Sequence, residues 1–556
     1  MVGFMTPLAW ACAGSVLAQT ANRPHSLPTE AASPDSSAAV RSLLSVLPTS
    51  DSVALVIPDL ARLDDSLGAI APRLGSGPLL SPLQWLRKRA EIVAGVDEHG
   101  AAAVTLGLTD PAAHFSRNLT LWIPTTDRDQ LFTFLNPSPQ ESGFVRVRIS
   151  GQEAFAAARG AHTVIGADTA MLRRVLDSPA GAVSALSNGQ LERLVTSDFA
   201  LQLTGVRGGS SGLPSRLPWT SELFGLSHLN AEALRAAVWT ARIGSDGVAV
   251  ALHRVSERPT SPAVVSGQGP TLVGLSDEPF IMAVTSRNTS AGPGALAFGG
   301  LAISAGVTAE IIDAMRAPEL ARRIEALTAP VVAQSFALSF SEAPPATLLA
   351  TVVLQTRSQE AQVTSDIESL VSLLKRGPFV DPRVNRLMEM AELRRAAERI
   401  AGVSVDHLTI RAGEANRIAT QTTTRIFGLE GFLVRIGWAA PDVLLMTIGG
   451  GTERFAHAVQ LIREGRAPLH ANPLIANVAQ RMPRMRNMEA YVSLDRLQRA
   501  ASFLVGETQR TPDSALPVAP MWLAGIDADP GELRLEGFIP VEALKSLIGA
   551  PDASAP

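Results

Sequence analysis

The sequence predicts an α+β protein made of two tandem copies of a mostly antiparallel sheet packed with helices. Short apolar runs with period-two alternation indicate strands, and tight turn signals between them favour antiparallel pairing. Segments with helical periodicity lie between the runs. One set of residues also recurs at a constant offset of 283 positions: Trp239, Ala241, Ile243, Asp246 and Leu252 return as Trp522, Ala524, Ile526, Asp529 and Leu535.

In the first half, residues 52–57 form an apolar run that predicts a buried strand, and Pro58-Asp59 ends it. Residues 144–149 read FVRVRI, the alternation of a half-buried strand. Thr163 to Gly166 predicts a strand that leads into a helix. The remaining expected elements are helices at 60–74, 83–93 and 169–176, strands at 101–108, 119–123 and 199–206, and a hairpin of 238–243 with 248–255 through Ser245-Asp246-Gly247.

The second half repeats much of this order. The motif Ile165-Gly166 with Thr169 returns as Ile448-Gly449 with Thr452 at the same offset. The strands expected here are 280–284, 333–340, 347–354, 432–436, 443–448, 522–526 and 533–539, and the expected helices are 309–327, 360–375, 382–400 and 452–462.

The domain organisation follows from composition. Residues 1–18 resemble a signal peptide, 19–39 predict a flexible linker rich in Pro, Ser and Ala, and folded pattern begins near Val40. The first repeat is expected over 40–260 and the second over 271–549, separated by the Pro- and Gly-rich segment 257–270. Residues 550–556 predict a disordered tail.

The apolar stretch from Leu8 to Ala18 indicates export out of the cytoplasm, with cleavage expected before Gln19. No Lys or Arg precedes this stretch, and Cys12 inside it leaves lipidation as a second possibility. Cys12 is the only cysteine, so cleavage leaves a chain without thiol chemistry or disulfides. We expect a periplasmic or secreted protein.

The charge balance argues against nucleic acid as a partner. The net charge is −4, and the 48 basic residues include only three lysines, Lys88, Lys375 and Lys545. No apolar run is long enough to predict an integral membrane span. The expected partner is an unidentified envelope protein or ligand, and the oligomeric state stays open.

Three motifs resemble catalytic or phosphate-binding signatures. Gly208 to Gly212 matches G-x-S-x-G, but the prolines that follow oppose the required helix. Ser372 and Lys375 match S-x-x-K, yet the serine lies near the end of an expected helix and no K-T-G follows. Gly449-Gly450-Gly451 precedes a helix without a P-loop lysine, so we interpret it as a turn, with Thr452 as the N-cap.

Two acidic segments are candidate metal sites. Asp97-Glu98-His99 groups three possible ligands in one turn, and 527–532 loosely resembles a calcium loop without its distal glutamate. Adjacent turn residues rarely converge on one ion, so the sequence predicts no metal, cofactor or catalytic residue.

Trp239 and Trp522 occupy the same place in the two repeats, each at the start of a strand that leads to a turn. Retention of a large aromatic side chain where turn residues differ favours packing over ligand binding. We therefore expect both indoles to be buried, each in the core of its own half.

In its signal segment, low-complexity spacer and duplicated strand–Ile-Gly–helix pattern, the chain resembles uncharacterised exported bacterial proteins with duplicated α+β domains. The resemblance covers nearly the whole length after residue 18 and implies no catalytic residue. The expected function is a non-catalytic extracytoplasmic binding or scaffold protein. Two alternatives stay open, an exported hydrolase with dispersed acidic residues and an envelope-assembly or lipid-associated factor.

Overall fold

The structure, a computed structural model, describes most of the chain between residues 34 and 548. The described ranges are 34–48, 52–75, 79–107, 119–139, 144–149, 151–204, 234–256, 271–287, 331–341, 348–377, 382–410, 431–505, 518–529 and 532–548, with a few positions within 319–330 and 424–430. The chain divides into two compact units, residues 1–261 with 528–556, and residues 262–527.

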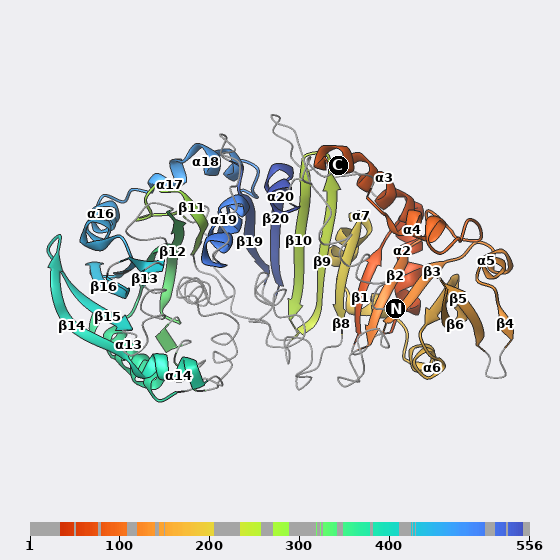
Figure 1. The fold of residues 1–556 in the computed structure, drawn as a ribbon, viewed down its shortest axis with the longest axis horizontal. Coiled ribbons are helices and arrows are strands. Elements are labelled where there is room, and N and C mark those ends of the chain that lie inside the picture. The colour runs from red at the N-terminus through yellow and green to blue at the C-terminus, as the bar shows by residue number, and fades with distance from the viewer. Residues whose placement is uncertain are drawn as a thin grey trace. The chain divides into compact units, whose positions relative to one another are not determined.

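The first unit contains one antiparallel sheet (Figure 1). The hydrogen-bonded order is β4-β5-β6-β7-β3-β2-β1-β8-β9-β10-β20. The strands are β1 (Ser52–Ile57), β2 (Ala102–Gly107), β3 (Leu119–Pro124), β4 (Ser138–Pro139), β5 (Val145–Ile149), β6 (Gln152–Arg159), β7 (His162–Gly166), β8 (Phe199–Thr204), β9 (Leu234–Gly244), β10 (Gly247–Ser256) and β20 (Glu532–Pro540).

Helices cover both faces of this sheet. On one face α2 (Pro34–Val46), α6 (Thr169–Asp177) and α7 (Asn188–Thr196) share a core with Ala54, Ala200 and Val238. On the other face α3 (Leu60–Ile70), the 3-10 helix η1 (Ala71–Leu74) and α20 (Val541–Ile548) pack on Ile57 and Ile243. On that second face α4 (Pro82–Lys88) and α5 (Arg128–Phe134) complete a further cluster. Helix α2 begins inside the expected linker, because its apolar side chains pack in the core formed with Ala54, Ala200 and Val238.

The second unit likewise contains a run of antiparallel strands. Its order is β14-β15-β16-β17-β13-β12-β11-β18-β19. The strands are β11 (Phe280–Arg287), β12 (Val331–Phe340), β13 (Leu348–Thr356), β14 (Ala391–Ile400), β15 (Val403–Ile410), β16 (Phe432–Ala440), β17 (Val443–Ile448), β18 (Met488–Val492) and β19 (Met521–Asp529).

Helices again lie on both faces. On one face α13 (Glu360–Lys375), α14 (Pro382–Glu389) and α19 (Leu494–Val505) share the largest core with the sheet. On the other face α16 (Gly451–Arg463) places Phe455 so close that a Cβ at Gly437 would lie 3.0 Å from its ring. The short helices α17 (Pro468–Ala471) and α18 (Pro473–Ala479) follow α16 along the chain.

The two sheets have the same strand order. When strands are counted from β1 in the first unit and from β11 in the second, both sheets run fourth, fifth, sixth, seventh, third, second, first, eighth, ninth. The helix that follows the seventh strand, α6 or α16, is separated from a preceding Ile-Gly pair by one or two residues in both. The α+β class and the antiparallel pairing of the strands are confirmed.

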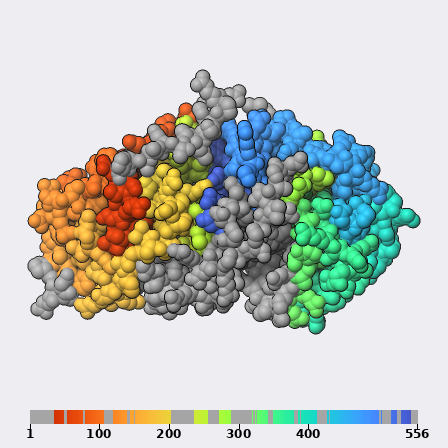
Figure 2. All heavy atoms as spheres, turned by 180° about the vertical axis from the view of Figure 1, so that it is seen from behind, coloured from red at the N-terminus to blue at the C-terminus, as the bar shows by residue number. Residues whose placement is uncertain are grey.

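Strand β20, the tenth strand when strands are counted from β11, pairs with β10 of the first unit. β20 forms an antiparallel ladder with β10 from Gly247–Pro540 to Val255–Glu532. In Figure 2 the dark-blue atoms of the C-terminal segment lie against yellow and yellow-green atoms of the first unit. The sequence places 528–549 in the second repeat, whereas the contacts place these residues in the first unit.

One expected helix is wrong over half of its length. Residues 382–400 were expected to be helical, but α14 ends at Glu389 and Ala391–Ile400 is strand β14. The segment AELRRAAERI consists of helix-favouring residues, and its pairing with β15 overrides that preference. The expected helix 309–327 and the strand end at 205–206 lie largely outside the described residues.

The two tryptophans do not occupy equivalent environments. Trp522 is 5% exposed, but Trp239 is only half-buried. Residues that lie directly opposite each other in neighbouring strands point to the same face of the sheet. Following these pairs from Trp522 leads through Tyr491 to Thr351, and α16 contacts Thr351. Trp522 therefore lies on the face that α16 covers. Trp239 points away from the face covered by α6 and α7, because its neighbour Val238 packs there. The expectation of two buried, equivalent indoles is therefore wrong for Trp239.

Candidate functional site

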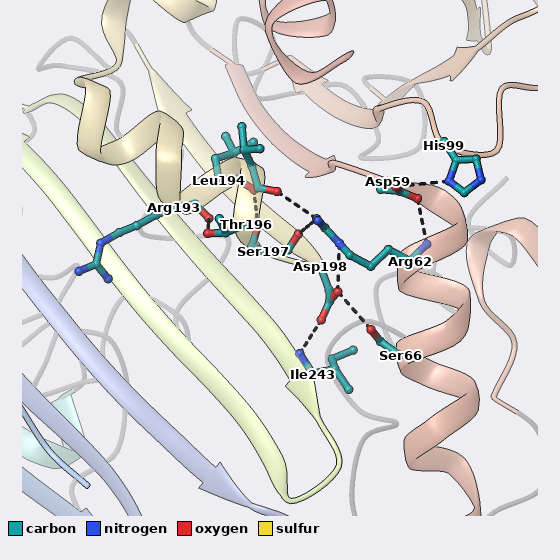
Figure 3. Close-up of polar contacts among 11 residues, drawn as sticks. Asp59, Arg62, Ser66, His99, Arg193, Leu194, Thr196, Ser197, Asp198 and Ile243 are labelled. Carbon is teal, nitrogen blue, oxygen red and sulfur yellow. Dashed lines mark hydrogen bonds and ion pairs between the residues drawn. The ribbon is translucent and has the colours of Figure 1, made fainter. Parts of the chain in front are cut away.

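A buried carboxylate, Asp198, lies where α7 ends and β8 begins in the first unit (Figure 3). The residue is 3% exposed. The Ile243 amide donates to its Oδ2 at 2.6 Å, and the Ser66 hydroxyl donates to its Oδ1 at 3.2 Å. Both carboxylate oxygens therefore accept from protein donors, which ties the start of β8 to β9 and α3.

Arg62 of α3 is the charged partner of this carboxylate. Its Nε lies 3.5 Å from Asp198 Oδ1, and its Nη2 donates to the carbonyl oxygens of Val195, at 3.1 Å, and Ser197. These two carbonyl groups lie at the C-terminal end of α7, where backbone carbonyl oxygens have no N–H donor within the helix. The Arg62 guanidinium of α3 thus caps the C-terminal end of α7.

Burial raises the pKa of Asp198 above its ordinary value, more than the Ile243 amide and the Arg62 charge lower it. A raised carboxyl pKa is one signature of a catalytic acid. Here the geometry argues for a structural role, because hydrogen bonds from Ile243 and Ser66 occupy the two oxygens.

The neighbouring turn residues point to different partners. Asp59 caps α3 by accepting from the Arg62 amide at 2.9 Å, and the exposed His99 ring lies 3.5 Å from its other oxygen. Glu98 pairs with Arg87, and Asp97 accepts from the His99 amide. The segment 97–99 is therefore a hydrogen-bonded turn with divergent side chains. Across the described residues, no group of three His, Cys, Asp or Glu side chains could hold a metal ion.

The second unit has a charged network on three neighbouring strands. Arg435 of β16 is 2% exposed and holds Glu430 through two nitrogens at 2.6 and 3.0 Å. Its Nε donates to Glu398 of β14 at 2.7 Å, and His407 Nε2 lies 2.7 Å from the same oxygen. Burial alone would raise the pKa of Glu398, but the hydrogen bonds from His407 and Arg435 lower it overall.

A second buried carboxylate of this unit is Glu489 in β18. It is fully buried, accepts from Arg486 Nε at 2.5 Å and accepts from the Tyr491 hydroxyl at 2.8 Å. Burial, together with the Glu489 charge, raises the pKa of Tyr491 well above its ordinary value. The phenol is a neutral donor that helps to satisfy the carboxylate.

Sequence reasoning did not single out these networks, because their members come from distant positions. Arg62 and Asp198, for example, are joined only by the fold. His253 of β10 is a further example, because its Nε2 lies 3.3 Å from Glu532 on β20. Burial lowers the pKa of His253 despite the Glu532 charge.

The two strand–helix turns differ in how they cap their helices. Asp168 is the N-cap of α6, and its Oδ1 accepts from the Met171 amide at 2.7 Å. In the second unit the N-cap is Gly450, and Thr452 lies inside α16, so the expected cap at Thr452 is wrong. Gly449, Gly450 and Gly451 have φ values of 68°, 72° and 65°, a path that only glycine follows easily.

The remaining motifs gain no catalytic context. Ser372 and Lys375 are both exposed in the last turns of α13. Gly208 to Gly212 lies outside the described residues, as does the turn at Pro530 and Gly531. No helix among the described residues is both long and apolar enough to cross a membrane.

No family model matches the chain, and no curated protein matches its sequence. Solved structures of TP0453 in crystal forms III, I and IV are similar to 50% of this chain. The form III and form I structures have TM-scores of 0.23 and 11% identity, with 97% and 96% of their own chains covered. The form IV structure has a TM-score of 0.21, 10% identity and 96% coverage.

Proposed function

We propose that this chain is a non-catalytic binding or scaffold protein that works outside the cytoplasm. The supporting observation is how its charged groups are used. Both carboxylate oxygens of Asp198 and of Glu489 accept hydrogen bonds from protein donors. A catalytic carboxylate needs an oxygen directed at a substrate, whereas these oxygens are directed at groups of the protein itself.

The scaffold consists of two copies of one α+β module. Its support is the shared strand order together with the sequence offset that relates Ile165-Gly166 to Ile448-Gly449. A chance resemblance at a few positions would not extend to the connectivity of nine strands. Duplication produces two related surfaces on one chain, which suits a binding protein.

The extracytoplasmic location is supported by the sequence of residues 1–18. Cellular fractionation of the full chain with a C-terminal tag tests it, and N-terminal sequencing of the recovered protein is expected to begin near Gln19. Abundant cytoplasmic protein with an intact Met1 would contradict the proposal.

Binding is tested on the same tagged cells. Photo-crosslinking in the intact envelope, followed by mass spectrometry, is expected to recover one recurring partner or glycan. As a test for a hydrolase, the purified protein is incubated with envelope polymers. Turnover that depends on Glu398 or Asp198 would replace the binding assignment with the enzymatic alternative.

A further inference from the structure

A pocket in the second unit lies between α13 and the outer strands of the sheet. Its apolar lining residues are buried or half-buried and are called the floor here: Ile367, Leu393, Ile436, Leu444 and Trp438. Its polar lining residues are exposed or half-buried and are called the rim: Glu360, Thr364, Arg395, Ser404 and Asp406. Trp438 is half-buried and lines this space.

An irregularity in the sheet borders the pocket. The ladder of β14 and β15 pairs Arg394 with His407 and then Glu398 with Val405, so the intervening β14 residues bulge. Ala396 has φ 47°, and its amide donates to Asp406 Oδ1 at 2.8 Å. Bulges redirect side chains and are frequent beside functional sites. This bulge positions Arg395 at the rim, with Nε 2.8 Å from Asp406.

The rim charges select against anions. Asp406 is compensated by Arg395, whose Nη1 also lies 2.8 Å from Glu368. Glu360 is exposed at the first position of α13 and adds a further carboxylate. A phosphate or carboxylate ligand would meet more negative than positive charge here. A neutral ligand with hydroxyl groups could donate to the carboxylates and accept from Arg395.

We propose that this pocket binds one ring of a neutral saccharide, with Trp438 as the stacking platform. A sugar ring presents C–H groups on its faces and hydroxyls at its edge, which matches an aromatic and apolar floor inside a polar rim. This inference rests on the proposed binding function and names its ligand class.

The test is isothermal titration calorimetry of the full chain with triacetylchitotriose, maltotriose and a soluble peptidoglycan disaccharide. We expect at least one saccharide to bind. Trp438→Ala is expected to weaken that binding about tenfold or more, Trp438→Phe is expected to keep part of it, and Glu360→Gln to weaken it without changing thermal unfolding. Trp239→Ala, a half-buried tryptophan of the first unit, is the matched control and is expected to bind normally.

Two results would overturn the proposal: no saccharide binding, or binding that Trp438→Ala leaves unchanged. Spermidine is titrated in parallel, and spermidine binding without saccharide binding would make the pocket a cation site instead. An envelope partner found by crosslinking while the saccharides fail to bind would refute this inference alone, and a cytoplasmic location would refute the proposed function.

Discussion

Leu252 and Leu535 lie directly opposite each other in the ladder of β10 and β20, and both are buried. They are also 283 positions apart in the sequence, the spacing that separates Trp239 from Trp522. An antiparallel ladder centred on corresponding residues is symmetric, so Ala249–Phe538 and Val255–Glu532 exchange under the same offset. The ladder is therefore centred on these two leucines.

This register can be tested by crosslinking. Ala251 and Glu536 are direct partners in the ladder. In a Cys12→Ser background, the pair Ala251→Cys and Glu536→Cys is expected to form an intramolecular disulfide. The Cα atoms of directly opposite residues in a ladder lie within the distance that a disulfide spans. Ala251→Cys with Arg534→Cys is offset by two positions and is the control. Mass spectrometry under non-reducing conditions that finds the control bridged more readily would show a different register.

The two tryptophans are expected to differ in their contribution to stability. Trp522→Ala removes a fully packed side chain and should lower the free energy of unfolding by about 3–5 kcal/mol. Trp239→Ala removes a half-buried one and should cost clearly less. Denaturant unfolding of both variants measures this, and equal losses would mean that Trp239 is buried in solution.

The raised pKa of Asp198 predicts that the free energy of unfolding depends on pH in the acidic range. Its folded-state pKa is raised above 3.8, so the folded chain binds more protons than the unfolded chain over this window. The free energy of unfolding should therefore fall as pH rises from about 3.8 through the folded-state pKa. Asp198→Asn should flatten this slope in denaturant titrations at several pH values. A slope unchanged by the substitution would contradict the assignment.

At neutral pH the same site separates charge from hydrogen bonding. Asp198→Ala leaves the Ile243 amide without its acceptor and should cost about 1–3 kcal/mol. Asp198→Asn keeps an acceptor oxygen and should cost less. The order of the two variants in thermal unfolding is the readout, and equal losses would assign the stabilisation to the charge, which both variants remove.

His253 predicts the opposite slope near neutrality. Burial lowers its folded-state pKa below 6.5, although Glu532 opposes the shift and Arg534 and Arg193 add to it. The unfolded chain then binds more protons, so stability should be lost as pH falls below about 6.5. His253→Gln should lose less over that range. Equal losses in both proteins would assign the effect to another group, such as His162, whose pKa burial also lowers.

The sequence anticipated the elements whose pattern is local. Strand β7 with helix α6, and the hairpin of β9 and β10, follow from alternation, an Asp N-cap and a Gly-containing turn. Strands β4, β6, β14, β15 and β18 were not anticipated. β6 and β14 are rich in alanine and arginine, and their strand conformation depends on neighbours that a local pattern does not reveal.

The charged networks were beyond sequence reasoning for a different reason. Arg62 and Asp198 meet only after α3 packs against the end of α7, and Arg435 joins residues of separate strands. The Trp239–Trp522 match also shows a limit of sparse identity. A shift of one position in a strand turns a side chain to the other face, which a repeated letter does not show.

The pairing of β10 with β20 has a consequence for how the chain is made. A ribosome releases β10 long before β20 exists, and until then one whole edge of the first sheet has unpaired amide and carbonyl groups. Such an edge is a template for pairing with other chains. Contacts between such distant segments also form slowly. The first unit therefore reaches its final form only after the second has been synthesised. A premature stop before β20 would leave the β10 edge unpaired and the sheet prone to aggregation.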